Sequence, residues 1–231
     1  MKPTSTAILI VLPFFIAYCQ APSAESKVRR EAIEWCDVWI PYSNQTDLPR
    51  VLLIGDSITK GYYSGVERNL RSKAYVARLA TSKAIGDPAL LLQLRAFLAE
   101  TRFDVVHFNI GMHGWAYTED EYRGNLPGVL AAIRQGAPGA KLIWASTTPV
   151  RKDKDGGPTN QRIQTRNLLA REYFTGQGIP TDDLHALMAP HPDLHSDDVH
   201  FNSAGCAMLA GQVAREVSKQ LTLVPAMNPT R

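Results

Sequence analysis

The sequence has few cysteines, no long basic cluster and no apolar run long enough to cross a bilayer. It contains three cysteines in 231 residues, and no spacing of cysteine and histidine is typical of a zinc site. The formal net charge is +3, and lysine and arginine form no block of the kind that binds nucleic acid. Internal repeats and low-complexity segments are absent as well. We therefore expect one α/β domain with no metal, no cofactor and no nucleic-acid partner.

The first two dozen residues differ from the rest of the chain. Lys2 precedes an apolar stretch at residues 7–18, and small residues follow at positions 21–24. An apolar stretch of this length is too short to span a membrane and is typical of a secretory signal peptide. We predict a signal peptide over residues 1–24, and a periplasmic or secreted mature protein without stable membrane association.

The cysteines leave two questions open. Cys19 raises the alternative of a lipoprotein, although Tyr18 is bulky where a lipid-attachment site prefers a small residue. After signal cleavage, Cys36 and Cys206 would be the only cysteines. In an oxidising compartment they could form a disulfide, and the alternative is two buried free thiols.

We divide the mature chain into a lead-in at residues 25–49, a main domain at 50–222 and a tail at 223–231. The lead-in carries Trp35 and Trp39. This aromatic pair could line a ligand groove, but we favour a segment that covers one edge of the sheet.

Apolar runs and helical periodicities alternate along the main domain. Short apolar runs predict five strands, within residues 50–54, 74–79, 103–110, 141–146 and 178–184. Helical spacing predicts helices within residues 61–73, 89–100, 119–135, 161–175 and 203–220. Strands that alternate with helices predict a three-layer α/β/α fold, with a five-stranded parallel sheet in the flavodoxin-like order.

The stretch at residues 50–59 runs from a buried strand into Gly55-Asp56-Ser57. A glycine allows a tight turn at this point, and a serine after it would lie at the carboxyl end of a parallel strand, where such sheets place their ligands. Ser57 is therefore a candidate nucleophile. The alternative is that Asp56 or Ser57 only caps the following helix.

A serine nucleophile needs a base and a group that orients the base. His200 is the candidate base, because two carboxylates shortly precede it. Asp197 could reach the ring through one tight turn, and Asp198 is the alternative partner. Four other histidines are expected to be structural or exposed: His107, His185, His191 and His195.

Gly55-Asp56-Ser57 after a strand, with Asp197 and His200 near the carboxyl terminus, resembles the SGNH/GDSL family of esterases and lipases. The resemblance covers the main domain and implies the SGNH hydrolase fold. It implies Ser57 as the nucleophile, His200 as the base and Asp197 as the orienting group. It also implies an oxyanion hole from the Ser57 amide, a glycine amide and the asparagine of a Gly-x-Asn-Asp block.

The two middle blocks of the family are less regular here. Gly86 lies in the region of the glycine block, where it opens a helix, and an ordinary turn glycine is the alternative. His113 stands in the asparagine position, within Gly111-Met112-His113-Gly114. This resembles a subset of the family with a Gly-x-His block. An imidazole N–H can donate a hydrogen bond, so His113 or, alternatively, Asn109 would complete the hole.

We expect an exported serine hydrolase that cleaves a carboxylic ester of a small molecule or glycan, with a short acyl group such as acetyl. One alternative is a non-catalytic carbohydrate-binding protein that uses Trp35, Trp39 and Trp115 as a stacking surface. Another is a lipase or an acyltransferase that uses the same residues as the esterase.

Overall fold

The computed structural model describes residues 28–224, and a six-stranded sheet lies at its centre. The strands are β1 (Cys36–Trp39), β2 (Arg50–Gly55), β3 (Tyr75–Thr81), β4 (Val105–Phe108), β5 (Lys141–Ala145) and β6 (Thr181–Asp182). Their order in the sheet is β1-β3-β2-β4-β5-β6. The five strands from β2 to β6 are parallel, in the flavodoxin-like order that the sequence predicts.

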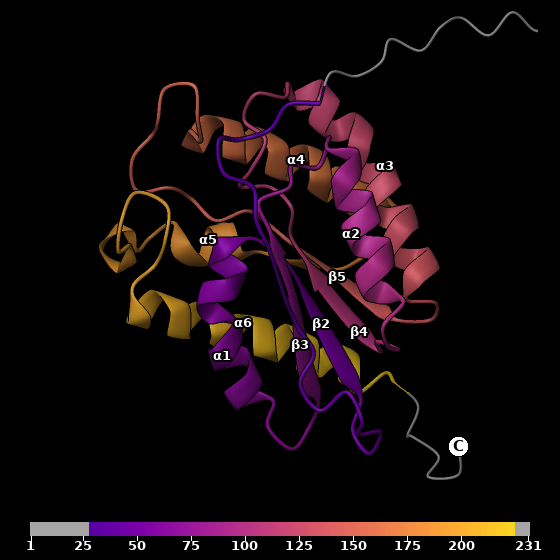
Figure 1. The fold of residues 1–231 in the computed structure, drawn as a ribbon. Helices are drawn as coiled ribbons and strands as arrows, with labels where there is room; N and C mark the ends of the chain where they lie inside the picture. The colour runs from indigo at the N-terminus through magenta and orange to yellow at the C-terminus, as the bar shows by residue number, and fades with distance from the viewer. Residues whose placement is uncertain (1–27, 225–231) are drawn as a thin grey trace, which may run out of the picture.

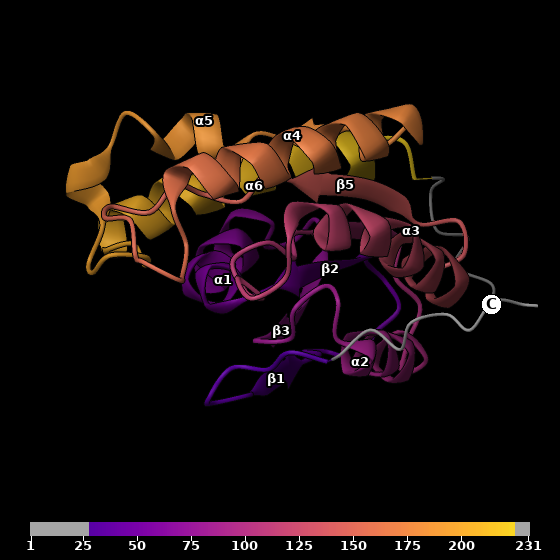
Figure 2. The ribbon, with the colours of Figure 1, turned by 90° about the horizontal axis from the view of Figure 1, so that it is seen from above.

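The predicted sheet lacked one strand. β1 pairs antiparallel with β3 and forms the outer edge of the sheet, beyond β3 in Figure 2. This strand belongs to the lead-in, which confirms the interpretation that the lead-in covers an edge. The prediction of five strands was wrong because a four-residue edge strand, exposed at three of its positions, carries little hydrophobic signal.

Helices cover both faces of the sheet. The helices are α1 (Ser57–Asn69), α2 (Pro88–Leu98), α3 (Glu119–Gly136), α4 (Asn160–Gly176), α5 (Leu184–Met188) and α6 (Ser203–Leu221), with a 3₁₀ turn at Pro192–Leu194. Side chains of α1, α5 and α6 share one core cluster, side chains of α2 and α3 share the other, and α4 contributes to both. Figure 1 shows α1 and α6 on one side of the sheet and α2 and α3 on the opposite side. The three-layer architecture is therefore present.

β2 explains why the fold has two cores. Val51 and Leu53 belong to the cluster beneath α1 and α6, whereas Leu52 and Ile54 belong to the cluster beneath α2 and α3. All four residues are fully buried. A strand that alternates its side chains between two covered faces must be apolar throughout. This is the pattern from which the strand was predicted.

Small residues bring α1 and α6 close together. A methyl group on Gly61 would lie 3.4 Å from the sulfur of Cys206, and one on Gly65 would lie 2.5 Å from Cβ of Ala210. The glycines on α1 and their partners on α6 are each four residues apart, so they face each other over one helical turn. The start of α6 is thereby held beside the start of α1, where Ser57 lies.

One element boundary differs from the sequence prediction: α1 begins at Ser57, without the loop expected before it, because the Asp56 side chain caps the helix. The helix predicted at residues 119–135 is α3, which contains Pro127 and whose start is stabilised by a capping box between Thr118 and Glu121.

The predicted signal peptide and all but the first two residues of the predicted tail lie outside the part of the chain that the structure describes. Cys36 and Cys206 are both free thiols, the first exposed and the second partly buried. Within residues 28–224, no helix is long and apolar enough to span a membrane.

Candidate active site

Ser57 lies at the carboxyl end of β2, as the first residue of α1. The carboxylate of Asp56 accepts a hydrogen bond from the Ile58 amide at 2.9 Å, so Asp56 is the helix cap and leaves the Ser57 hydroxyl free for another partner. Gly55 is required at this turn, because a Cβ there would lie 2.0 Å from the hydroxyl oxygen of Thr59. The amide of Ser57 belongs to the helix amino terminus, which favours negative charge.

His200 and Asp197 lie beside Ser57. Nε2 of His200 is 2.8 Å from Oγ of Ser57, and Nδ1 of His200 is 2.8 Å from Oδ2 of Asp197. The other carboxylate oxygen, Oδ1, accepts from the amides of Val199 and His200, both at 2.7 Å. The structure therefore brings Ser57, His200 and Asp197 into one hydrogen-bonded chain.

The environment of Asp197 keeps its carboxyl group ionised. Partial burial raises its pKa, but the backbone amides of His200 and Val199 and the ring of His200 outweigh this effect and lower the pKa to about 2. Asp198 has a different partner, since its carboxylate accepts from Arg151 at 3.0 Å. Of the two possible partners for His200, only Asp197 contacts the ring.

A second histidine, His195, holds in place the loop that carries Asp197 and His200. The ring of the buried His195 lies against Phe201, and its Nε2 is 3.2 Å from the Pro149 carbonyl oxygen. The Ser196 amide donates to the His200 carbonyl at 2.8 Å. His195 was expected to be exposed, but it fixes the loop because a short bridge with Phe201 turns its side chain inward.

Solvent reaches the site readily. The side chain of His200 is 44% exposed and that of Asp197 is 58% exposed. The reacting groups therefore lie in an open surface and not at the bottom of a deep pocket.

Asn109 offers no free donor to this site. Its side-chain amide donates both hydrogens, to the Ala145 carbonyl at 2.7 Å and to the Thr147 hydroxyl at 3.0 Å. The structure thus assigns Asn109 to the support of the loop after β5, contrary to the alternative of an oxyanion donor.

Gly86, the predicted glycine of the oxyanion hole, packs closely on the ring of Tyr117. A Cβ at this position would lie 2.6 Å from a ring carbon.

His113 follows β4, next to the end of β2. Its Nδ1 is 2.9 Å from a carboxylate oxygen of Glu31. Its Nε2 is buried and has no hydrogen-bond partner in residues 28–224. The sequence interpretation missed the contact of Glu31 with His113, because Glu31 lies in the lead-in and no local motif connects the two residues.

Asp56 shows that His113 lies close to the start of α1. Burial raises the pKa of this carboxyl group, and four influences oppose that effect. These four influences are the nearby His113, the amides of Ile58 and Thr59, and the nearby His200. His113 and His200 therefore both act on the turn that carries Ser57.

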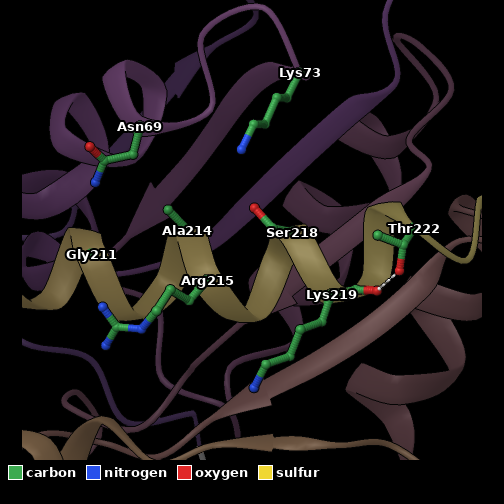
Figure 3. A pocket seen from close by; sticks show the side chains of 8 residues that line it. All are labelled: Asn69, Lys73, Gly211, Ala214, Arg215, Ser218, Lys219 and Thr222. Atoms are coloured by element: carbon green, nitrogen blue, oxygen red, sulfur yellow. Dashed lines mark hydrogen bonds between the residues drawn. The ribbon is translucent and has the colours of Figure 1, made fainter.

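The remaining conspicuous features are remote from this site. His107 and Asp182 form a fully buried pair at 3.0 Å inside the sheet. A surface hollow, shown in Figure 3, lies at the far end of α1 and is lined by Asn69, Lys73, Gly211, Ala214, Arg215, Ser218, Lys219 and Thr222. Asn69 and Ser57 are separated by the whole of α1, about 18 Å. No group of residues in the described chain is suited to hold a metal ion.

A parallel α/β sheet whose carboxyl edge carries a hydroxyl–imidazole–carboxylate chain is the architecture of a serine hydrolase. The model of the GDSL-like lipase/acylhydrolase family matches residues 53–208, more than half of the chain. The chain belongs to this family, also called SGNH hydrolases, and is an esterase or acylhydrolase of the GDSL type. No curated protein matches the sequence.

Several solved structures share the fold. An aryl esterase from M. smegmatis has 16% sequence identity and a TM-score of 0.64, over 74% of this chain and 99% of that chain. A GDSL-like lipase from Bacteroides thetaiotaomicron has 19% identity and a TM-score of 0.61, over 74% and 88%. An acetylxylan esterase from Geobacillus stearothermophilus has 17% identity and a TM-score of 0.61, over 74% and 96%.

Proposed function

We propose that this protein hydrolyses esters of short acyl groups, such as acetyl, through Ser57, His200 and Asp197. The observation that carries the proposal is the continuous chain of contacts from Oγ of Ser57 to the Asp197 carboxylate, with both links at 2.8 Å. Oγ attacks the acyl carbon while Nε2 of His200 takes its proton. Asp197 accepts from Nδ1, which keeps the lone pair of Nε2 directed at the serine.

The tetrahedral intermediate needs donors for its negative oxygen. The amide of Ser57 at the start of α1, the amide of Gly86 and the ring of His113 are the donors in this proposal. His200 then protonates the leaving alcohol. A water molecule, deprotonated by His200, attacks the acyl-enzyme and releases the acid.

The open surface around His200 supports a substrate with a short acyl group and a large alcohol component, such as an acetylated glycan. A long acyl chain would gain little there, because burial of apolar surface supplies most of its binding energy. One structural relative is an acetylxylan esterase, which makes acetylated glycans the first substrates to test. A lipase or an acyltransferase would use the same residues.

The rival function, a carbohydrate-binding surface without catalysis, depended on three tryptophans. The ring of Trp115 already carries the guanidinium groups of Arg166, at 4.3 Å, and of Arg162, at 5.4 Å. Its face is therefore occupied by cation–π contacts. Trp39 is more than half exposed on β1, and Trp35 lies beside His113.

The test compares the release of p-nitrophenol from the acetate, butyrate and octanoate esters with the release of acetate from acetylated xylan. The Ser57→Ala variant is expected to lose on the order of 10⁴-fold or more in kcat. Ser218→Ala, a partly buried serine on α6 that is remote from this site, is the matched control and should retain the wild-type rate. Equal rates for Ser57→Ala and the wild type would refute the proposal, and faster octanoate cleavage would refute the short-acyl preference.

We also propose that the protein is exported, on the basis of the charged and apolar pattern at residues 1–24. The amino-terminal sequence of the protein recovered from outside the cytoplasm should begin between residues 22 and 26. An intact amino terminus on a cytoplasmic protein would contradict this.

A further inference from the structure

A groove lies between α1, which begins at Ser57, and α6, which begins three residues after His200. Its volume is about 280 Å³. This is near the lower end of the range for small-molecule sites, ~300–1,000 Å³. The residues that line the groove include Gly61, Ser64 and Arg68 on one wall, and Phe201, Ser203 and Ala207 on the other.

The wall formed by α1 continues the helix face that carries Ser57. Gly61, Ser64 and Arg68 lie four, seven and eleven positions after the serine. With 3.6 residues per turn, these positions share one face of an α-helix. At a rise of 1.5 Å per residue, Gly61 is about 6 Å from Ser57 along the helix axis and Arg68 about 16 Å. The groove therefore begins one helical turn from Ser57 and leads away from it.

The opposite wall starts directly after His200. Phe201 is the next residue, and Ser203 and Ala207 follow in the first two turns of α6. Nε2 of His200 is 2.8 Å from Oγ of Ser57, so this contact joins the starts of the two walls. Figure 1 shows α1 and α6 side by side, which agrees with their close approach at the glycines of α1.

The lining combines polar groups with apolar surface. The side chains of Ser64, Arg68 and Ser203 are exposed, and they make no hydrogen bond to another residue within 28–224. Phe201 and Ala207 add apolar surface. A sugar ring has hydroxyl groups at its edge and C–H groups on its faces, so it matches such a lining. A long acyl chain would instead remove water from the guanidinium without replacing its hydrogen bonds.

The direction of proton transfer relates the groove to one part of the substrate. In the proposed reaction, Nε2 of His200 gives its proton to the alcohol oxygen as the bond from that oxygen to the acyl carbon breaks. The alcohol component must therefore lie next to His200, where the groove begins. We propose that the groove is the subsite for this component, and that a sugar occupies it with hydroxyl groups bonded to Arg68 and Ser203. This inference rests on the proposed function of Ser57.

The first test fills the groove in the full-length protein. The measured quantity is the ratio of kcat/KM for acetylated xylo-oligosaccharides to kcat/KM for ethyl acetate, whose short alcohol does not extend as far as Gly61. In Ala207→Trp this ratio should fall by about 10- to 100-fold, the equivalent of two or more lost hydrogen bonds. Ala204→Trp is the matched control, because this exposed alanine of the same helix does not line the groove. It should keep the wild-type ratio.

The second test removes the cation at the far end of the groove. Arg68→Gln should lower the same ratio by about 3- to 10-fold, as expected for one hydrogen bond. The change should appear in KM for the oligosaccharide and not in kcat, because the sugar is bound equally in the ground state and the transition state. Arg71→Gln changes an exposed arginine that does not line the groove, so it should keep the wild-type ratio.

Two outcomes would overturn the proposal. One is a ratio that stays at the wild-type value in both Ala207→Trp and Arg68→Gln, and the other is an equal fall in these variants and their controls. If circular dichroism shows that Ala207→Trp is unfolded, Arg68→Gln decides alone, and an unchanged ratio overturns the proposal. Activity that survives Ser57→Ala on both substrates would instead refute the proposed function, so the two failures can be distinguished.

Discussion

Two histidine–carboxylate pairs include predicted site residues, His200 and His113, and the chain builds them in different ways. Asp197 and His200 are three residues apart, and their side chains are 58% and 44% exposed. Glu31 and His113 are 82 residues apart, and their side chains are 44% and 17% exposed. The first pair needs only one turn of backbone, whereas the second needs the lead-in and the end of β4 to meet at the same edge of the sheet.

The carboxylates also differ in how they are held. Asp197 uses one oxygen for two backbone amides and the other for the ring of His200. Glu31 uses a single oxygen for both the ring of His113 and the more distant Gly114 amide. The local pair is therefore the more rigid one, although it is the more exposed. Backbone hydrogen bonds, and not burial, make its geometry reliable.

Among the variants of these pairs, the largest expected effect comes from Asp197→Asn. The amide oxygen of asparagine can still accept from the Val199 and His200 amides, but its NH₂ group would face Nδ1 of His200. Nδ1 must then become an acceptor, which places the hydrogen on Nε2, where it cannot receive the serine proton. We expect a loss of kcat on the order of 10³- to 10⁴-fold on p-nitrophenyl acetate, with unchanged folding by circular dichroism.

Asp198→Asn is the matched control, because its carboxylate accepts from Arg151 and does not contact the ring. Its kcat should remain within about threefold of the wild type, as for an exposed ion pair. Comparable losses in the two variants would show that the loop geometry, and not the tautomer of His200, determines the rate.

The same contrast explains what could be predicted from the sequence. Buried strands can be predicted from their unbroken apolar runs. The contact between Asp197 and His200 can be predicted from their spacing of three residues. The sequence could not decide between Asp197 and Asp198, because the directions of two adjacent side chains depend on the local backbone conformation. In the structure the Asp198 carboxylate accepts a hydrogen bond from Arg151 and does not contact His200.

Glu31 could not be predicted in this way. Nothing in its neighbourhood distinguishes it from Glu34, and only the assembled sheet shows which of the two meets His113. Asn109 illustrates the converse: an amide two residues from a family motif is a reasonable oxyanion donor until its hydrogens are found on Ala145 and Thr147. Partners that come from distant segments are set by tertiary packing.

A third histidine–carboxylate pair, His107 with Asp182, extends the comparison to the stability of the fold. Both side chains are fully buried, and Gln212 donates to the second oxygen of Asp182 at 2.9 Å. His107→Leu would keep the volume but leave one oxygen of a buried carboxyl group without its partner. We expect a loss of about 3 kcal/mol in the free energy of unfolding, measured in urea.

The kcat of folded His107→Leu should equal that of the wild type, because the pair contacts neither Ser57 nor His113. A large fall in kcat in a fully folded His107→Leu variant would mean that the three pairs are coupled through the sheet. This pair could then no longer be called purely structural.

The smallest effect concerns the stability that the ionised Asp197 provides. Its pKa is lowered from 3.8 to about 2 in the folded protein. A lowered pKa means that ionised Asp197 stabilises the fold above about pH 4, and that this contribution is lost as the pH falls towards 2. Because the side chain is more than half exposed, solvent screening keeps the contribution small. The difference in Tm between the wild type and Asp197→Asn should therefore be measurable at pH 6 and shrink at pH 2.5. A difference that does not change with pH would mean that folding does not lower the pKa of Asp197.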